Sequence, residues 1–231
     1  MRGVQLQNLV IRLKQMVGQS SNPSAGVDDL DAIKEAIRET QEVLYDEYDW
    51  PFLRVIRSKD MAAGQRFYDF PTDLNLDRLE EISNYWSGQP HPLTRGIGFG
   101  EYGQYDSDND ERADPVRRWD VRWTGTTPQM EVWPIPVAND QVIKFRGIRT
   151  LRPLVADSDV CDLDDRLIVL YAAADILSEQ GSRKSERIAA RAQARFATMK
   201  SRANTGGADT IVYGGGAMQR PTRDHVIIRV R

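Results

Sequence analysis

The hydrophobic pattern of the first fifty residues predicts two amphipathic helices. The stretch from Gly18 to Gly26 is rich in residues that break helices, so it separates the two. In the first helix, over residues 4–17, apolar side chains recur three or four positions apart and share one face: Leu6, Leu9, Val10, Leu13 and Val17. A second set at helical spacing runs from Leu30 to Tyr48, and Pro51 is expected to end that helix.

The pattern changes to short alternating or β-branched runs between residues 52 and 150. Such runs, separated by Pro and Gly, are typical of strands. They cover residues 54–59, 66–70, 79–86, 116–123, 130–134 and 141–146. Of the 19 aromatic residues, 16 lie between Tyr45 and Phe145, including all five Trp. We expect a small antiparallel β sandwich or barrel here, with a loop over residues 97–115 that contains the acidic segment 104–114.

Helical spacing returns after Pro153. Either Asp159 or Asp162 is expected to cap a helix with this buried face: Leu163, Leu167, Leu170, Tyr171, Ala174 and Leu177. Gly181 and Ser182 should break it. A last helix follows, with Ile188, Ala192, Phe196 and Met199 on one side.

The order of these elements predicts an α+β fold. N- and C-terminal helices would form a helical bundle, into which an antiparallel β sandwich or barrel is inserted, and an extended C-terminal arm would follow. We divide the chain into N-terminal helices (1–50), a β-rich insert (51–157), C-terminal helices (158–203) and a flexible arm (204–231).

The arm holds two β-prone pieces beside runs of glycine. Glycine is costly to order, so such a tail either stays disordered in the free monomer or adds a strand to a partner's sheet. Folding on assembly would reconcile both interpretations. The candidate partner-binding residues are Thr210, Ile211, Val212 and Tyr213 in the first piece, and Val226, Ile227, Ile228, Arg229 and Val230 in the second.

Charge is unevenly distributed along the chain. The net charge is −3, but residues 181–231 hold eleven Lys and Arg against three Asp and Glu, whereas the preceding residues hold 20 against 31. A basic end on an acidic body suits a nucleic acid, an acidic protein or a neighbouring copy. A solvated helix face is the simpler alternative. The candidate DNA or subunit contacts are Arg183, Lys184, Arg187, Arg191, Arg195 and Lys200.

The sequence offers no pattern typical of catalysis. His91 and His225 lie far apart, neither has a metal-ligand pattern nearby, and the single Cys161 is expected to pack as a small apolar side chain. Residues 98–103 spell GxGxxG, but an acidic segment follows where a nucleotide site needs a helix N-terminus. We expect no enzyme, cofactor or metal site. An unfamiliar active site among the aromatic residues of the insert is the remaining alternative.

No apolar run approaches the roughly 20 residues of a membrane span. The first residues also lack the apolar core of a signal peptide. We therefore expect no membrane partner, and folding in the cytoplasm.

Several short motifs, taken in order, resemble the head-to-tail adaptor (connector, or head completion) proteins of tailed bacteriophages. They span roughly residues 4–200 and are Asp49-Trp50-Pro51-Phe52-Leu53, Tyr68-Asp69-Phe70-Pro71, Val132-Trp133-Pro134-Ile135-Pro136, Leu151-Arg152-Pro153-Leu154, and Leu163-Asp164-Asp165 before Ile168–Ala174. The acidic segment 104–114 and the glycine-rich arm depart from the family pattern.

The resemblance implies a virion structural protein in the neck of the particle. Such proteins form a ring, commonly a dodecamer, between the portal protein and a tail or tail-completion protein, and the genomic DNA passes through the bore. Assembly would take place in the host cytoplasm, and the arm would reach a neighbouring virion protein. The alternative function is a nucleic-acid-binding module that uses the basic C-terminal helix and tail.

Overall fold

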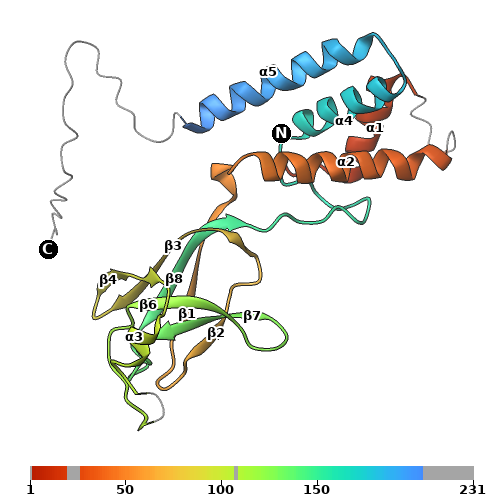
Figure 1. Cartoon of the computed structure of the whole chain (residues 1–231). Coiled ribbons are helices and arrows are strands. Elements are labelled where there is room, and N and C mark those ends of the chain that lie inside the picture. Colours follow the sequence, from red (N-terminus) through yellow and green to blue (C-terminus); the bar gives the residue numbers. More distant parts are fainter. Residues whose placement is uncertain (1, 20–26, 107–108, 205–231) are drawn as a thin grey trace, which may run out of the picture.

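The computed structural model describes residues 2–19, 27–106 and 109–204. Its elements are α1 (Leu6–Val17), α2 (Val27–Glu47), the short 3-10 helix η1 (Pro51–Leu53), β1 (Arg54–Asp60), β2 (Phe67–Asp69), β3 (Leu74–Trp86), β4 (Gln89–Pro92), β5 (Thr94–Arg95), α3 (Phe99–Tyr102), β6 (Arg118–Trp123), β7 (Pro128–Trp133), β8 (Val142–Arg149), α4 (Asp165–Glu179) and α5 (Lys184–Asn204). The four long helices gather at one end of the molecule and the strands at the other (Figure 1). The fold is therefore α+β.

Helix α4 lies at the centre of the helical part. It packs against α1, α2 and α5, and α1 also packs against α2. All four helices contribute to one apolar core, for example through Leu9, Ile37, Leu167 and Phe196. Cys161 lies in the same core and is fully buried, as expected of a small apolar side chain.

The strands form two four-stranded sheets, with the orders β1-β8-β3-β4 and β2-β7-β6-β5. One apolar core joins them, with Ile82 and Phe145 from the first sheet and Tyr68 and Met130 from the second. Of the two predicted forms, a sandwich or a barrel, the barrel is wrong for the described residues, because the two sheets do not close into one. The second sheet is mixed rather than purely antiparallel, since β5 runs parallel to β6.

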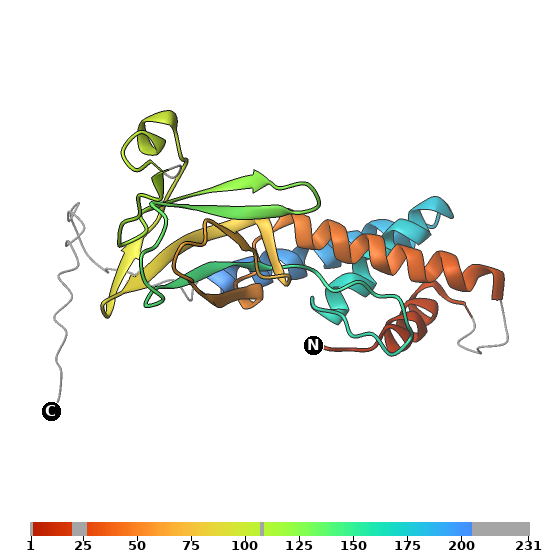
Figure 2. The same ribbon diagram turned by 90° about the horizontal axis from the view of Figure 1, so that it is seen from below.

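Three short elements differ from the sequence-based prediction. Strand β4 contains Pro90 and Pro92 and lies outside the predicted strands. It lies at the edge of its sheet, where a residue without an N–H is tolerated. Strand β5 has only two residues, and the predicted loop over residues 97–115 contains the single-turn helix α3. Figure 2 shows α3 at the outer side of the strand-rich part, away from the long helices.

Asp164, rather than Asp159 or Asp162, caps α4. Its carboxylate accepts the Leu167 N–H at 3.0 Å. The carboxylate of Asp159 accepts the N–H groups of Val155 and Ala156 instead. The carboxylate of Asp162 is buried and binds arginines, so neither predicted cap is available to the helix.

Arginines join the helical part to the sheets. Arg78 of β3 donates a hydrogen bond of 2.6 Å to the carbonyl of Tyr45 at the end of α2, and its guanidinium lies 4.5 Å from the Tyr45 ring centroid. Arg149 of β8 and Arg152 hold Asp162, just before α4. Burial alone would raise the pKa of Asp162, but hydrogen bonds from these arginines lower it below its usual value. The contacts connect both parts through buried or half-buried charges.

Candidate partner-binding surface

One side of α5 carries a row of cations along nearly its whole length. Lys184, Arg187, Arg191, Arg195 and Arg202 are spaced three, four or seven residues apart, which places them on one face of the helix. The row extends about 27 Å at the rise of an α-helix. The apolar residues Ile188, Ala192 and Phe196 lie on the adjoining face and enter the core. We call these five cations the basic row.

Arg195 is the member of the basic row that also holds the fold together. Its Nε and Nη2 donate to the two carboxylate oxygens of Asp164 at 2.7 and 2.8 Å. Burial of Asp164 alone would raise its pKa, but the hydrogen bonds from Arg195 and from the Leu167 N–H bring it below its usual value. The pair fixes the middle of α5 to the first turn of α4.

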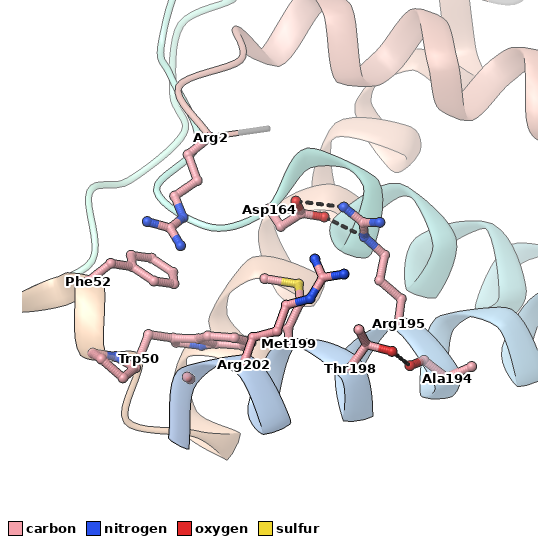
Figure 3. A pocket seen from close by; sticks show the side chains of 11 residues that line it. Arg2, Trp50, Phe52, Asp164, Ala194, Arg195, Thr198, Met199 and Arg202 are labelled. Carbon is pink, nitrogen blue, oxygen red and sulfur yellow. Dashed lines mark hydrogen bonds and ion pairs between the residues drawn. The ribbon is translucent and has the colours of Figure 1, made fainter. Parts of the chain in front are cut away.

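A cleft of about 670 Å³ lies beside this pair, between α5, the segment before α1 and η1 with the preceding Trp50 (Figure 3). Its walls combine cations and apolar rings. Arg2 lies on one side with its guanidinium 3.3 Å from the Phe52 ring centroid, and Arg202 lies on the α5 side. Desolvation lowers the pKa of Arg2. Neither Arg2 nor Arg202 forms an ion pair within the described chain, so both guanidiniums can bind an incoming carboxylate or phosphate.

A second cleft, of about 660 Å³, extends the positive charge across α4 to α1. It is lined by Arg12, Arg166 and Arg195, together with Asp165. Arg12 is bound to the buried Asp165, whereas Arg166 is exposed and has no ion pair among the residues described. Arginines from three helices therefore meet on this side of the molecule.

The opposite side of α4 carries a groove of the opposite charge. This groove has a volume of about 820 Å³ and lies between α2 and α4. Five carboxylates line it and no lysine or arginine does: Glu35, Glu39, Glu47, Asp175 and Glu179. We call it the acidic groove. Arg166 and Asp175 are nine residues apart on α4, about two and a half turns, and so point to opposite sides of the helix.

The structure separates the six cations predicted as DNA or subunit contacts. Arg183, Lys184, Arg187 and Arg191 are exposed and form no ion pair with another described residue. Arg195 is half-buried against Asp164.

Lys200 lies off the basic row. It comes five residues after Arg195, about 140° further round the helix. Its Nζ lies 4.1 Å from the Phe196 ring centroid and 3.8 Å from Glu47. The contact with Glu47 places Lys200 at the end of the acidic groove instead.

The predicted arm residues lie outside the described part of the chain. These are Thr210, Ile211, Val212, Tyr213, Val226, Ile227, Ile228, Arg229 and Val230.

Several residues of this surface were missed by sequence analysis. Arg2, Arg12 and Arg166 come from segments without a charge run, and only packing brings them next to α5. The acidic groove did have a local signal, because Glu35, Glu39 and Glu47 recur at multiples of four residues along α2.

Residues 2–19, 27–106 and 109–204 contain neither a candidate metal cluster nor a candidate membrane-spanning helix. In these ranges, no three His, Cys, Asp or Glu side chains are arranged to hold a metal ion. Within the same ranges, no helix combines the length and the apolar character needed to cross a membrane.

Comparison with known proteins identifies the family. No curated protein matches the chain. The family model described as SU10 adaptor protein matches residues 5–219, which is nearly the whole chain. The helices, the strands, the basic row and the acidic groove all fall within the matched residues. The chain therefore belongs to the SU10 adaptor protein family, a family of head–tail adaptors of tailed bacteriophages.

Proposed function

We propose that this phage adaptor forms a ring between the portal protein and a tail or tail-completion protein, and that the genomic DNA passes through its bore. Family membership implies a place in the virion neck and contacts with other head and tail proteins. The ring, its twelve subunits, the portal contact and assembly in the host cytoplasm are part of the proposal. The protein would work by binding and shape, without catalysis.

The observation that carries the proposal is the pair of unlike charged surfaces on the helical part. Subunits of a closed ring meet head to tail, so each must present two different and complementary patches. The basic row of α5 and the acidic groove meet this requirement, because they lie on different sides of α4 and carry opposite charges.

The strand-rich part offers separate surfaces for other virion proteins. Phe99 on α3 is 96% exposed, and Trp123 at the end of β6 is 69% exposed. Ile56 is 65% exposed on β1, an edge strand that pairs only with β8 among the described strands. An edge of this kind can accept an added strand. We propose that the arm, residues 204–231, supplies such a strand to a neighbouring protein through Thr210–Tyr213 or Val226–Val230.

Cryo-electron microscopy of the particle, together with mass photometry of the purified protein with and without portal protein, tests this function. We expect one ring in the neck and a discrete oligomer in solution. A protein that stays monomeric, binds neither portal nor tail protein and is absent from the virion would contradict the proposal.

Nucleic-acid binding remains the second candidate, because Lys184, Arg187 and Arg191 are exposed and unpaired in the described chain. Binding to phosphates should weaken steeply as salt is raised. Gel shifts with duplex DNA at two salt concentrations separate the cases. Tight binding by the isolated subunit, lost in Arg187→Glu/Arg191→Glu, would favour this candidate over a protein partner for the row.

A further inference from the structure

The acidic groove combines an apolar floor with charged walls. Ile33, Leu44 and Ile176 line it together with the five carboxylates. Val43 also lines the groove and is 56% exposed, so it adds accessible apolar surface between the carboxylates. An apolar floor under a charged rim is the arrangement that a groove offers to an amphipathic helix.

Three of the carboxylates lack a cation. Glu39, Asp175 and Glu179 form no ion pair with any described residue, whereas Glu35 is bound to Arg38 and Glu47 lies 3.8 Å from Lys200. Desolvation raises the pKa of Asp175, and the neighbouring charges of Glu39 and Glu179 raise it further. The isolated subunit thus holds like charges together, and a cation from outside would relieve their repulsion.

The spacing of charges in the groove matches the basic row. On α2, Glu35, Glu39, Val43 and Glu47 follow one another at four-residue intervals. On α5, Arg187, Arg191 and Arg195 follow at the same interval. Side chains at this spacing lie about 6 Å apart along the helix axis and form a ridge, and such ridges interdigitate when two helices pack. Of these three arginines, Arg187 and Arg191 form no ion pair with another described residue.

We propose that the acidic groove of one copy receives the basic row of α5 from a second copy of this chain. The proposal rests on the ring assembly argued above and assigns its subunit contact. Arg187 and Arg191 would enter the groove beside Glu39, Asp175 and Glu179. The contact would repeat from copy to copy because each copy offers its own Arg187 and Arg191 to the next.

Charge reversal on one face at a time tests the contact. Arg187→Glu/Arg191→Glu makes both faces acidic, and Glu39→Lys/Glu179→Lys makes both faces basic. We expect each double variant to raise the concentration at which rings form by about tenfold or more, since like charges across an interface are strongly unfavourable. Glu42→Lys is the matched control, because Glu42 is exposed on α2 but does not line the groove. Circular dichroism melting checks that every variant is folded.

Restoring complementarity should restore the ring. The quadruple variant with both faces reversed is expected to assemble at concentrations close to those of the wild type. A mixture of the two double variants is expected to form rings in which the variants alternate, at concentrations where neither variant forms rings alone. Mass photometry reads both results, with portal protein added if the ring requires it.

A cysteine pair gives an independent check. Cys161 is the only native cysteine and is buried, so Glu39→Cys/Arg191→Cys introduces the only exposed thiols. Mild oxidation should yield a ladder of covalent multimers, and Glu42→Cys/Arg191→Cys should not.

The outcomes separate this contact from the function. The contact would be overturned if both double variants formed rings at the same concentration as the wild type. It would also be overturned if the quadruple variant folded but did not assemble. Either result would leave the adaptor function standing. If the double variants still formed rings but no longer bound portal protein, the groove would be a binding site for portal protein. That result would also overturn the contact. A wild type that forms no ring even on portal would contradict both.

Discussion

Arg195 and Asp164 form a two-point ion pair, with nitrogen–oxygen distances of 2.7 and 2.8 Å, between the middle of α5 and the residue that caps α4. Asp164 is nearly buried, with 10% of its side chain exposed, while 31% of the Arg195 side chain is exposed. One cation of the basic row is therefore committed to the fold, and its neighbours are available for contacts with other molecules.

Arg195→Gln should lower stability where Arg191→Gln does not. The first change removes both arginine hydrogen bonds from a largely buried carboxylate, and the loss of a charged hydrogen bond costs about 1–3 kcal/mol. The second removes an exposed charge without an ion pair in the described chain, so the effect should stay within about 0.5 kcal/mol. Urea unfolding of both variants measures the difference. Equal losses would show that the pair does not fix α5 to α4.

Glu131 of β7 is a buried acid that binds two arginines and a tyrosine of the strand-rich part. Its carboxylate is buried, with 1% of its side chain exposed, and accepts hydrogen bonds from Arg66 and Arg122 at 2.7 Å each and from the Tyr102 hydroxyl at 2.8 Å. Glu131→Gln should cost about 3 kcal/mol, since a buried ion pair loses one charge. Asp120→Asn is the control, because Asp120 contacts the same Arg122 at 3.6 Å from a more exposed position. We expect the control to cost less than about 1 kcal/mol in thermal unfolding.

Acid should destabilise the protein through a small set of carboxylates. Burial alone would raise the pKa of Glu131, Asp162 and Asp164, but hydrogen bonds from arginines bring each below its usual value. A carboxylate with a lowered folded-state pKa stabilises the fold above its unfolded pKa of about 4, and that contribution is lost as pH falls through the folded value. Stability measured by urea unfolding should therefore fall below about pH 4. Glu131→Gln should fall less steeply, and an unchanged slope would exclude Glu131 as a contributor.

Sequence reasoning predicted the features that depend on neighbours along the chain. The apolar face of α5 at Ile188 and Phe196, and the cations beside it, follow from one periodicity in one segment. The acidic groove was missed because Glu39 and Asp175 come from helices on either side of the strands in sequence. Strand β4 was missed because Pro90 and Pro92 normally oppose a strand, and only its place at the sheet edge permits them.

Gly147 occupies a position in β8 where no side chain fits. A β-carbon there would lie 2.9 Å from the carbonyl oxygen of Arg78 and 3.2 Å from the α-carbon of Leu79, at the irregular register between β3 and β8. Gly147→Ala should therefore cost about 1–3 kcal/mol, because the backbone of β3 must move. Gly100→Ala on α3 is the control, since nothing lies within 4 Å of its added carbon. Comparable melting temperatures for the two variants would contradict the close approach of β3 to β8.

Asp175→Asn should raise the stability of the subunit and weaken its assembly. Desolvation first, and then the charges of Glu39 and Glu179, raise the pKa of Asp175, so its ionised form is less favourable in the folded subunit than in the unfolded chain. Removing the like-charge contact with Glu179, four residues away, should gain about 0.2–0.5 kcal/mol at pH 7. The gain should vanish below about pH 4, where the wild-type carboxyl is protonated in both the folded and the unfolded state.

The same change removes one carboxylate from the acidic groove, so rings should form only at higher protein concentration and with a weaker response to salt. Unfolding curves at pH 7 and pH 3.5, with mass photometry at two salt concentrations, measure both effects, and a variant that is less stable yet assembles normally would contradict the role given to this groove.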